Sequence, residues 1–243
     1  MIHLGEKYIN SNGENSRLRI GASTVYSKDS PKYPTAYLGI AAGTDIVNPL
    51  FIDDYIGILP PGRRARAERY RNISDKVNCI VSYLMLKDLL QEHYGIEDPG
   101  DFILNEHGKP FLKGNSDIYF SISHTKNAAV VAVAGFEIGV DIESFRRLEN
   151  NLIDMVATEN EKKCIEAASD RNRAFFRLWT MKESYAKSYG LGIADILKKD
   201  TERYGYIYID DDRFQAAVYL GRYRDLKENI EIVFSEDIPD IYI

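Results

Sequence analysis

The stretch GVDIE at residues 139–143 is followed, after a long run, by WTMKESYAK at residues 179–187. The first stretch begins with apolar residues and alternates like a strand, so Asp141 and Glu143 should point to the same face. The second stretch is typical of a helix and carries a third acid one turn before a lysine. Together these acids can hold a hard metal ion with a cation beside it, which suits chemistry on a phosphate ester or anhydride.

Each of these residues also has a simpler explanation. Two acids at an exposed strand end can be solvated, and Glu183 and Lys187 can form a surface ion pair worth only about 0.5 kcal/mol. Trp179, the only tryptophan of the chain, is expected to anchor its helix in the core rather than to contact a ligand. For Lys182 two alternatives stay open, a phosphate contact and a solvated side chain.

Magnesium is the metal ion that the three acids favour. Asp141, Glu143 and Glu183 offer oxygen ligands, and Mg²⁺ is commonly shared between carboxylates and substrate phosphates. Zinc is not expected, because no histidine or cysteine accompanies these acids.

Several basic residues are candidates for contacts with an anion. His124 follows a strand-like segment, stands between hydroxyl-bearing neighbours and precedes Lys126, although a lone histidine is more often structural. Lys109 lies in a Gly-Lys-Pro turn and is uninformative by itself. A dense cationic segment is either a solvated helix face or a local phosphate site. This segment contains Arg63, Arg64, Arg66, Arg69 and Arg71.

Composition excludes several other classes of protein. The 243 residues are 44% hydrophobic and carry a net charge of −6, so no overall basic field favours nucleic acid or an anionic membrane. The chain has no charged-then-apolar leader and no apolar run near 18 residues. Cys79 and Cys164 are expected to be two buried free thiols, so we expect a cytoplasmic protein. Nucleotide-binding glycine loops and a serine-hydrolase elbow are lacking.

The order of elements predicts an α/β (α+β) fold in which strand, long helix and strands occur twice. A first helix should run from an N-cap at Ser74 to about Tyr94, with Gly95 as its stop. Segments 158–169 and 172–189 should be helices, and strands are expected at 118–123, 128–134, 138–143, 204–209, 213–220 and 230–234. Residues 1–33 should form a loose hairpin or extension, with halves at 34–136 and 137–243 and the ligand between the halves.

Four motifs resemble those of the 4'-phosphopantetheinyl transferase superfamily, and the length and the two halves resemble its Sfp-type branch. They are GKP at 108–110, FSISHT at 120–125, GVDIE at 139–143 and WTMKESYAK at 179–187. They occur in the family's order and spacing, and the resemblance covers about residues 35–200. It implies two similar halves related by a pseudo-twofold, each a small sheet on a long helix, with coenzyme A in the cleft between them.

The resemblance also implies an activity. The family moves the phosphopantetheine arm of coenzyme A to a serine of an acyl or peptidyl carrier protein and releases 3',5'-ADP. By motif position, Asp141, Glu143 and Glu183 would surround Mg²⁺ on the pyrophosphate. Glu183 would also be the base for the carrier serine, and Lys187 would stabilise charge on the leaving group.

The remaining implied contacts are to coenzyme A. His124 with Ser123 would face the 3'-phosphate, and Lys109 and Pro110 would border the adenine. The predicted coenzyme A contacts are Arg63, Arg66, Lys109, Pro110, Ser123, His124, Lys182 and Lys187.

One position departs from the family's pattern. Asn78 stands where an arginine for coenzyme A is often found, and Lys76 or the arginine segment would have to replace it. The departure keeps open the alternative of a non-catalytic coenzyme A or nucleotide-binding protein on the same fold. A metal-dependent phosphohydrolase is a weaker alternative.

Two further expectations concern the surface of the protein. Arg146 and Arg147 are either part of the surface that binds the carrier protein or simply solvated. A monomer is expected, because one chain completes the cleft.

Overall fold

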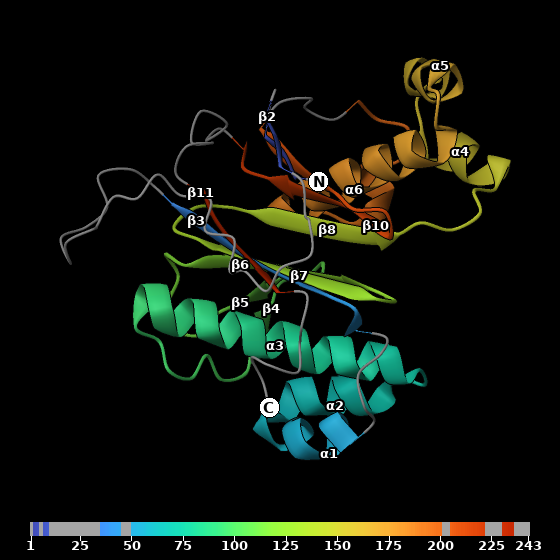
Figure 1. Cartoon of the computed structure of the whole chain (residues 1–243). Coiled ribbons are helices and arrows are strands. Elements are labelled where there is room, and N and C mark those ends of the chain that lie inside the picture. Colours follow the sequence, from blue (N-terminus) through green and yellow to red (C-terminus); the bar gives the residue numbers. More distant parts are fainter. Residues whose placement is uncertain are drawn as a thin grey trace.

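The protein is seen in a computed structural model that describes residues 2–4, 7–9, 35–44, 50–200, 205–221 and 230–235. Two sheets lie face to face, and each carries one long helix on its outer face (Figure 1). Helix α3 (Ile73–Tyr94) covers one sheet and α6 (Arg171–Tyr189) covers the other. The predicted α+β class is confirmed, whereas the pseudo-twofold relation between halves stays a prediction.

The two sheets differ in size and meet along one edge of each. The first has the order β11 (Ile230–Ser235), β3 (Ala36–Ala42), β7 (Ala128–Ala134), β6 (Tyr119–Thr125). The second has the order β2 (Lys7–Ile9), β1 (Ile2–Leu4), β9 (Tyr206–Asp210), β10 (Phe214–Tyr219), β8 (Gly139–Ser144). Neighbouring strands are antiparallel except β11 and β3, which are parallel.

Shorter elements surround these layers. Helices α1 (Leu50–Tyr55) and α2 (Pro61–Arg69), joined by the 3₁₀ turn η2 (Ile56–Ile58), lie beside α3. Helices α4 (Asn150–Val156) and α5 (Glu159–Ala167) precede α6, and η3 (Ile193–Asp195) follows it. Strands β4 (Ile103–Leu104) and β5 (Pro110–Phe111) form a separate hairpin. None of the described helices is both long and apolar enough to cross a bilayer.

The main core lies between the two sheets, because the strands of both carry apolar side chains on their facing surfaces. Leu38 and Val130 of the first sheet join Val140 and Val218 of the second in one buried cluster. A second cluster forms where α3 packs on the other face of β3 and β7. Every residue of β7 is apolar and buried, which is expected of a strand covered on both faces.

Most predicted elements are present, and the structure corrects several predictions. The first helix begins two residues earlier than predicted: Asn72 is the N-cap, and its side chain donates to Asp75 (3.1 Å). Gly95 ends this helix in the left-handed region (φ 69°), as predicted. Helices α1 and α4 were not predicted; α4 lies in a run whose sequence indicated only a polar stretch. Cys164 is exposed rather than buried.

The division at residues 33, 136 and 137 stays a prediction, and strand pairing crosses it twice. Strand β1 pairs with β9, and β11 pairs with β3. Each sheet therefore takes a strand from the opposite end of the chain. Strands β1 and β2 pair in antiparallel fashion, while most of the predicted hairpin or extension at residues 1–33 lies outside the described residues.

A close approach between β8 and α6 depends on Gly139. A Cβ atom added there would lie 1.9 Å from the backbone oxygen of Ser184 and 2.6 Å from the backbone nitrogen of Ser188. Backbone atoms cannot move aside as the end of a flexible side chain can. The glycine therefore sets how near α6 comes to the acids of β8.

We predict that Gly139→Ala lowers the free energy of unfolding by about 1–3 kcal/mol or more, because the added methyl group overpacks this contact. Urea denaturation would measure the loss. Gly135→Ala is the matched control, since a Cβ atom there meets nothing within 4 Å, and its effect should stay within about 0.5 kcal/mol. Equal effects of the two substitutions would contradict the argument.

Candidate active site

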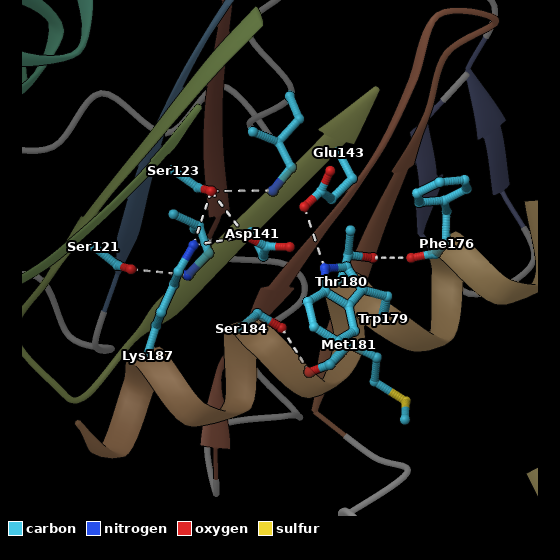
Figure 2. Close-up of polar contacts among 12 residues, drawn as sticks. Ser121, Ser123, Asp141, Glu143, Phe176, Trp179, Thr180, Met181, Ser184 and Lys187 are labelled. Atoms are coloured by element: carbon cyan, nitrogen blue, oxygen red, sulfur yellow. Dashed lines mark hydrogen bonds and ion pairs between the residues drawn. The ribbon is translucent and has the colours of Figure 1, made fainter. Parts of the chain in front are cut away.

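The two acids of β8 face helix α6 (Figure 2). Asp141 is buried, and its Oδ1 accepts from the Lys187 ammonium group (2.6 Å) and from the Ser123 hydroxyl (2.8 Å). Lys187 also donates to the Ser123 oxygen (2.9 Å). A buried carboxylate needs such partners, so these three side chains form one connected group across β6, β8 and α6.

Glu143 lies two residues further along β8 and is held from two sides. The Trp179 indole donates to its Oε1 (3.2 Å), and the exposed Arg146 pairs with its Oε2 (3.2 Å). Burial, and then the charge of Asp141, raises the pKa of Glu143. Trp179 packs with the apolar residues of α6, as predicted, but it also holds a site carboxylate, which the sequence did not indicate.

Glu183 completes the group of acids from α6. Burial, and then the charges of Asp141 and Glu143, raises its pKa to about 7, although Lys187 opposes this. The charges interact because the helix places Glu183 and Lys187 on the face toward β8. The structure therefore brings together all four residues that the two quoted motifs contributed.

The donor set suits Mg²⁺ in its chemistry, and Asp141 retains one carboxylate oxygen for a cation. Asp141 Oδ2 is buried and has no hydrogen-bond partner, a costly state for a carboxylate oxygen. Within the described part of the chain, no three histidine, cysteine or acidic side chains form a group that could hold a metal ion by themselves. An ion shared with substrate phosphates needs fewer protein ligands.

A second, cationic group surrounds His124 at the end of β6. Its ring meets Tyr70 edge to face (5.9 Å between centroids), and the Tyr70 hydroxyl accepts from Arg66 (3.2 Å). Burial lowers the pKa of His124 to about 4, Asp75 opposes the shift, and the charges of Arg66, Lys187 and Arg63 lower the pKa further. The imidazole is therefore neutral near pH 7 and lies among cations.

Arg63 and Arg66 differ in how they are held. Arg63 donates to the Cys79 carbonyl and the Ser82 hydroxyl (3.2 Å each), which ties α2 to α3. Burial lowers the pKa of Arg63. Arg66 is exposed, so its guanidinium group is the more accessible of the two.

The Gly-Lys-Pro turn lies against the C-terminal end of α6. The Lys109 ammonium group donates to the Ser188 carbonyl and is largely buried, which lowers its pKa. Pro110 begins β5 and pairs with Leu104. Cations are favourable at a helix C-terminus, so Lys109 has a structural partner in this conformation.

Lys182 requires a correction, because it fits neither of the predicted alternatives. Its side chain is fully buried. The ammonium nitrogen lies 3.0 Å from Glu161 Oε2 and donates to the Lys199 carbonyl (2.7 Å). Successive helical residues point about 100° apart, so Lys182 projects toward α5 while Glu183 faces β8. Lys182 therefore joins α6 to α5 and is not a coenzyme A contact in this structure.

Asn78, the position that departs from the family's pattern, is also buried. Its amide donates to the Thr125 carbonyl (2.6 Å) and so attaches α3 to the turn after β6. The residue supports the segment that carries His124 instead of presenting a charge.

Comparison with known proteins agrees with the motifs. Residues 137–232 match the family model described as the 4'-phosphopantetheinyl transferase superfamily. The predicted resemblance to this superfamily is confirmed. The matched residues include β8 and α6, which carry the three acids and Lys187.

Several curated relatives are named 4'-phosphopantetheinyl transferases. The chain is 30% identical to 4'-phosphopantetheinyl transferase gsp of Aneurinibacillus migulanus, over 62% of this chain and 61% of the relative. It is 29% identical to psf-1 of Bacillus pumilus, over 58% of this chain and 62% of the relative. It is 30% identical to HetI of Nostoc sp., over 60% and 65%. The match spans about three fifths of the length of these relatives.

The raised pKa of Glu183 predicts how stability depends on pH without metal. Its folded pKa of about 7 lies above its ordinary value of 4.5. Between about pH 4.5 and 7, Glu183 is therefore still protonated in the folded state but ionised in the unfolded state. The free energy of unfolding consequently falls as pH rises through this range. In EDTA, the melting temperature should fall less between about pH 5 and pH 8 in Glu183→Gln than in the parent protein.

Glu166→Gln is the control for this experiment. Glu166 is exposed on α5, and its substitution changes the net charge equally. It should retain the parent dependence on pH. If Glu183→Gln also retained it, the raised pKa of Glu183 would be contradicted.

Proposed function

We propose that this protein transfers the 4'-phosphopantetheine arm of coenzyme A to a serine of an acyl or peptidyl carrier protein and releases 3',5'-ADP, with Mg²⁺. The observation that carries the proposal is the ion pair of Lys187 with Asp141 (2.6 Å) where β8 adjoins α6, with Glu143 and Glu183 close enough to interact electrostatically with Asp141. Transfer from a pyrophosphate needs an acceptor for a proton and cations for the leaving group. The names of the curated relatives support the same reaction.

Glu183 has the properties required of the base. In the metal-free protein its pKa is about 7, and a bound cation would favour the ionised carboxylate, which is the form that accepts a proton. In the proposed step the carrier serine oxygen bonds to the phosphorus that bears the pantetheine arm. The bond from that phosphorus to the bridging oxygen breaks, its electron pair leaves with 3',5'-ADP, and Glu183 takes the serine proton. Lys187 offsets the negative charge that develops on the leaving group.

Asp141, Glu143 and Glu183 would hold the magnesium ion together with the pyrophosphate. Their fit rests on the buried, unpartnered Asp141 Oδ2, and on burial together with the negative charge of the neighbouring acids, which raise the pKa of the two glutamates. When bound, Mg²⁺ supplies positive charge to the pyrophosphate and its leaving group. Trp179 keeps Glu143 oriented toward this position.

The cationic group around His124 suits the 3'-phosphate of coenzyme A. Arg66 is exposed beside the Tyr70 hydroxyl, and the neutral imidazole can donate one hydrogen bond without adding a charge. Lys109 and Pro110 are kept as proposed neighbours of the adenine. Arg63 would act through its charge, because its terminal nitrogen already bonds to α3.

A non-catalytic coenzyme A-binding protein is the second candidate. Asn78 favours it, since the arginine often used on coenzyme A is replaced by a buried amide. The complete group of acids with Lys187 favours the enzyme instead, because a binding protein has no need of a base.

The function is tested by the intact mass of an apo carrier protein after incubation with the protein, coenzyme A and Mg²⁺. We expect a gain of one phosphopantetheine that EDTA prevents. Asp141→Asn and Glu183→Gln should each slow the transfer at least about 100-fold, whereas Glu166→Gln should not. Coenzyme A binding without modification of any carrier would support the second candidate. Release of free phosphopantetheine would instead indicate a hydrolase.

The 3'-phosphate contact predicts a difference between two substrates. Arg66→Ala should raise the KM for coenzyme A about tenfold, through loss of a charge-assisted contact, and leave the KM for 3'-dephospho-coenzyme A unchanged. Arg69→Ala is the control, since Arg69 is exposed on the same helix and bonds to its own backbone. An equal change with both substrates would contradict this assignment.

The carrier surface, the monomeric state and the cytoplasmic location stay predictions. Arg146 pairs with Glu143, and Arg147 is exposed beside it. Both would lie close to the reacting serine, where an acidic helix of a carrier protein would find complementary charge.

A further inference from the structure

Ser123 makes three hydrogen bonds in the middle of the site. Its hydroxyl donates to Asp141 Oδ1 (2.8 Å), and its oxygen accepts from the Lys187 ammonium group (2.9 Å) and from the backbone nitrogen of Ile142 (3.4 Å). The side chain is buried. It is therefore the point at which β6, β8 and α6 connect through polar atoms.

The bonding capacity of a hydroxyl group decides what else Ser123 can do. A serine hydroxyl has one hydrogen to donate and two lone pairs to accept with. Asp141 takes the hydrogen, and Lys187 and Ile142 use the lone pairs. The family resemblance implied that Ser123 faces the 3'-phosphate of coenzyme A. A hydrogen bond from the Ser123 hydroxyl to that phosphate would require its hydrogen bond to Asp141 to break.

The same bonds fix the direction of the Asp141 carboxylate. Both Ser123 and Lys187 bind Oδ1, while Oδ2 is buried without a partner. The carboxylate is thus held by one oxygen, and the other is left for a cation. Without the Ser123 hydroxyl, neither the rotation of the carboxylate nor the position of the ammonium group would be restrained from the β6 side.

We propose that Ser123 is a positioning residue, an inference that rests on the function proposed above. Its hydroxyl orients Asp141 toward the metal ion and holds Lys187 beside it, and it does not contact coenzyme A. Hydrogen bonds to metal-ligating carboxylates commonly change metal affinity by about 10- to 100-fold.

Ser121 provides a matched control within the same strand. It lies two residues earlier on β6 and accepts from the backbone nitrogen of Val140 (3.0 Å), as Ser123 does from that of Ile142. No bond joins it to Asp141 or Lys187 among the contacts found in the described residues. Ser121→Ala therefore removes an equivalent bond between the strands and leaves the site side chains in place.

The test is direct binding of Mn²⁺, a paramagnetic substitute for Mg²⁺, measured by electron paramagnetic resonance with saturating coenzyme A and without carrier, because the ion is to be shared with the pyrophosphate. Ser123→Ala should weaken Mn²⁺ binding about tenfold or more. Ser123→Thr, which restores a hydroxyl group, and Ser121→Ala should remain within about twofold of the parent. Circular dichroism and thermal melting would establish that each variant is folded. If Ser123→Ala does not fold, Ser123→Cys keeps the volume with a much weaker donor.

The outcomes separate this inference from the proposed function. Parent-like Mn²⁺ binding by Ser123→Ala, or equal weakening in Ser121→Ala, would overturn the positioning role, as would a parent protein that binds no Mn²⁺. If the expected pattern appears but the parent protein modifies no carrier, the positioning role stands and the transferase proposal fails. The KM of Ser123→Ala for coenzyme A should also stay near that of the parent protein at saturating Mg²⁺.

Discussion

Hydrogen bonds between the hydroxyl groups of β6 and the backbone of β8 join the two sheets and place the site. Strand β8 ends its own sheet, so alternate N–H groups along its outer edge need acceptors from elsewhere. Alternate side chains of β6 supply them. The bonds are Val140 to Ser121 (3.0 Å), Ile142 to Ser123 (3.4 Å) and Ser144 to Thr125 (2.9 Å). The acids of β8 are consequently held in a fixed register opposite β6.

The short distance between β8 and α6 concentrates charge at this junction. Gly139 allows the backbones to approach, and the helix then places Glu183 within electrostatic reach of Asp141 and Glu143. Repulsion among these acids costs stability unless cations or protons offset it. Lys187 and Arg146 offset part of it, and the pKa values of Glu143 and Glu183 rise. A divalent cation bound with a polyphosphate would relieve the remainder, so the junction is better suited to the complex with substrate than to the free protein.

Sequence periodicity predicted the local structure well, because helices and buried strands follow from the spacing of apolar residues. It also placed Asp141 with Glu143, and Glu183 with Lys187, since each pair lies on one element. It failed for Lys182, whose partner Glu161 lies on another helix. It failed equally for Trp179, whose bond to Glu143 crosses from helix to strand. The alternating hydroxyls of 121–125 were a signal for the contact with β8, but only a second strand at the right distance gives them that meaning.

The sequence by itself determined most of the elements, the acids and the family resemblance, because motif residues and their spacing are properties of one stretch of chain. The tertiary structure decided which oxygen of Asp141 is bound and which is left over, that Ser123 uses all its bonding capacity within the protein, and that Lys182 is buried. It also decided that each sheet takes a strand from the opposite end of the chain. These features depend on distances between segments far apart in sequence, and such distances are set only when the sheets pack.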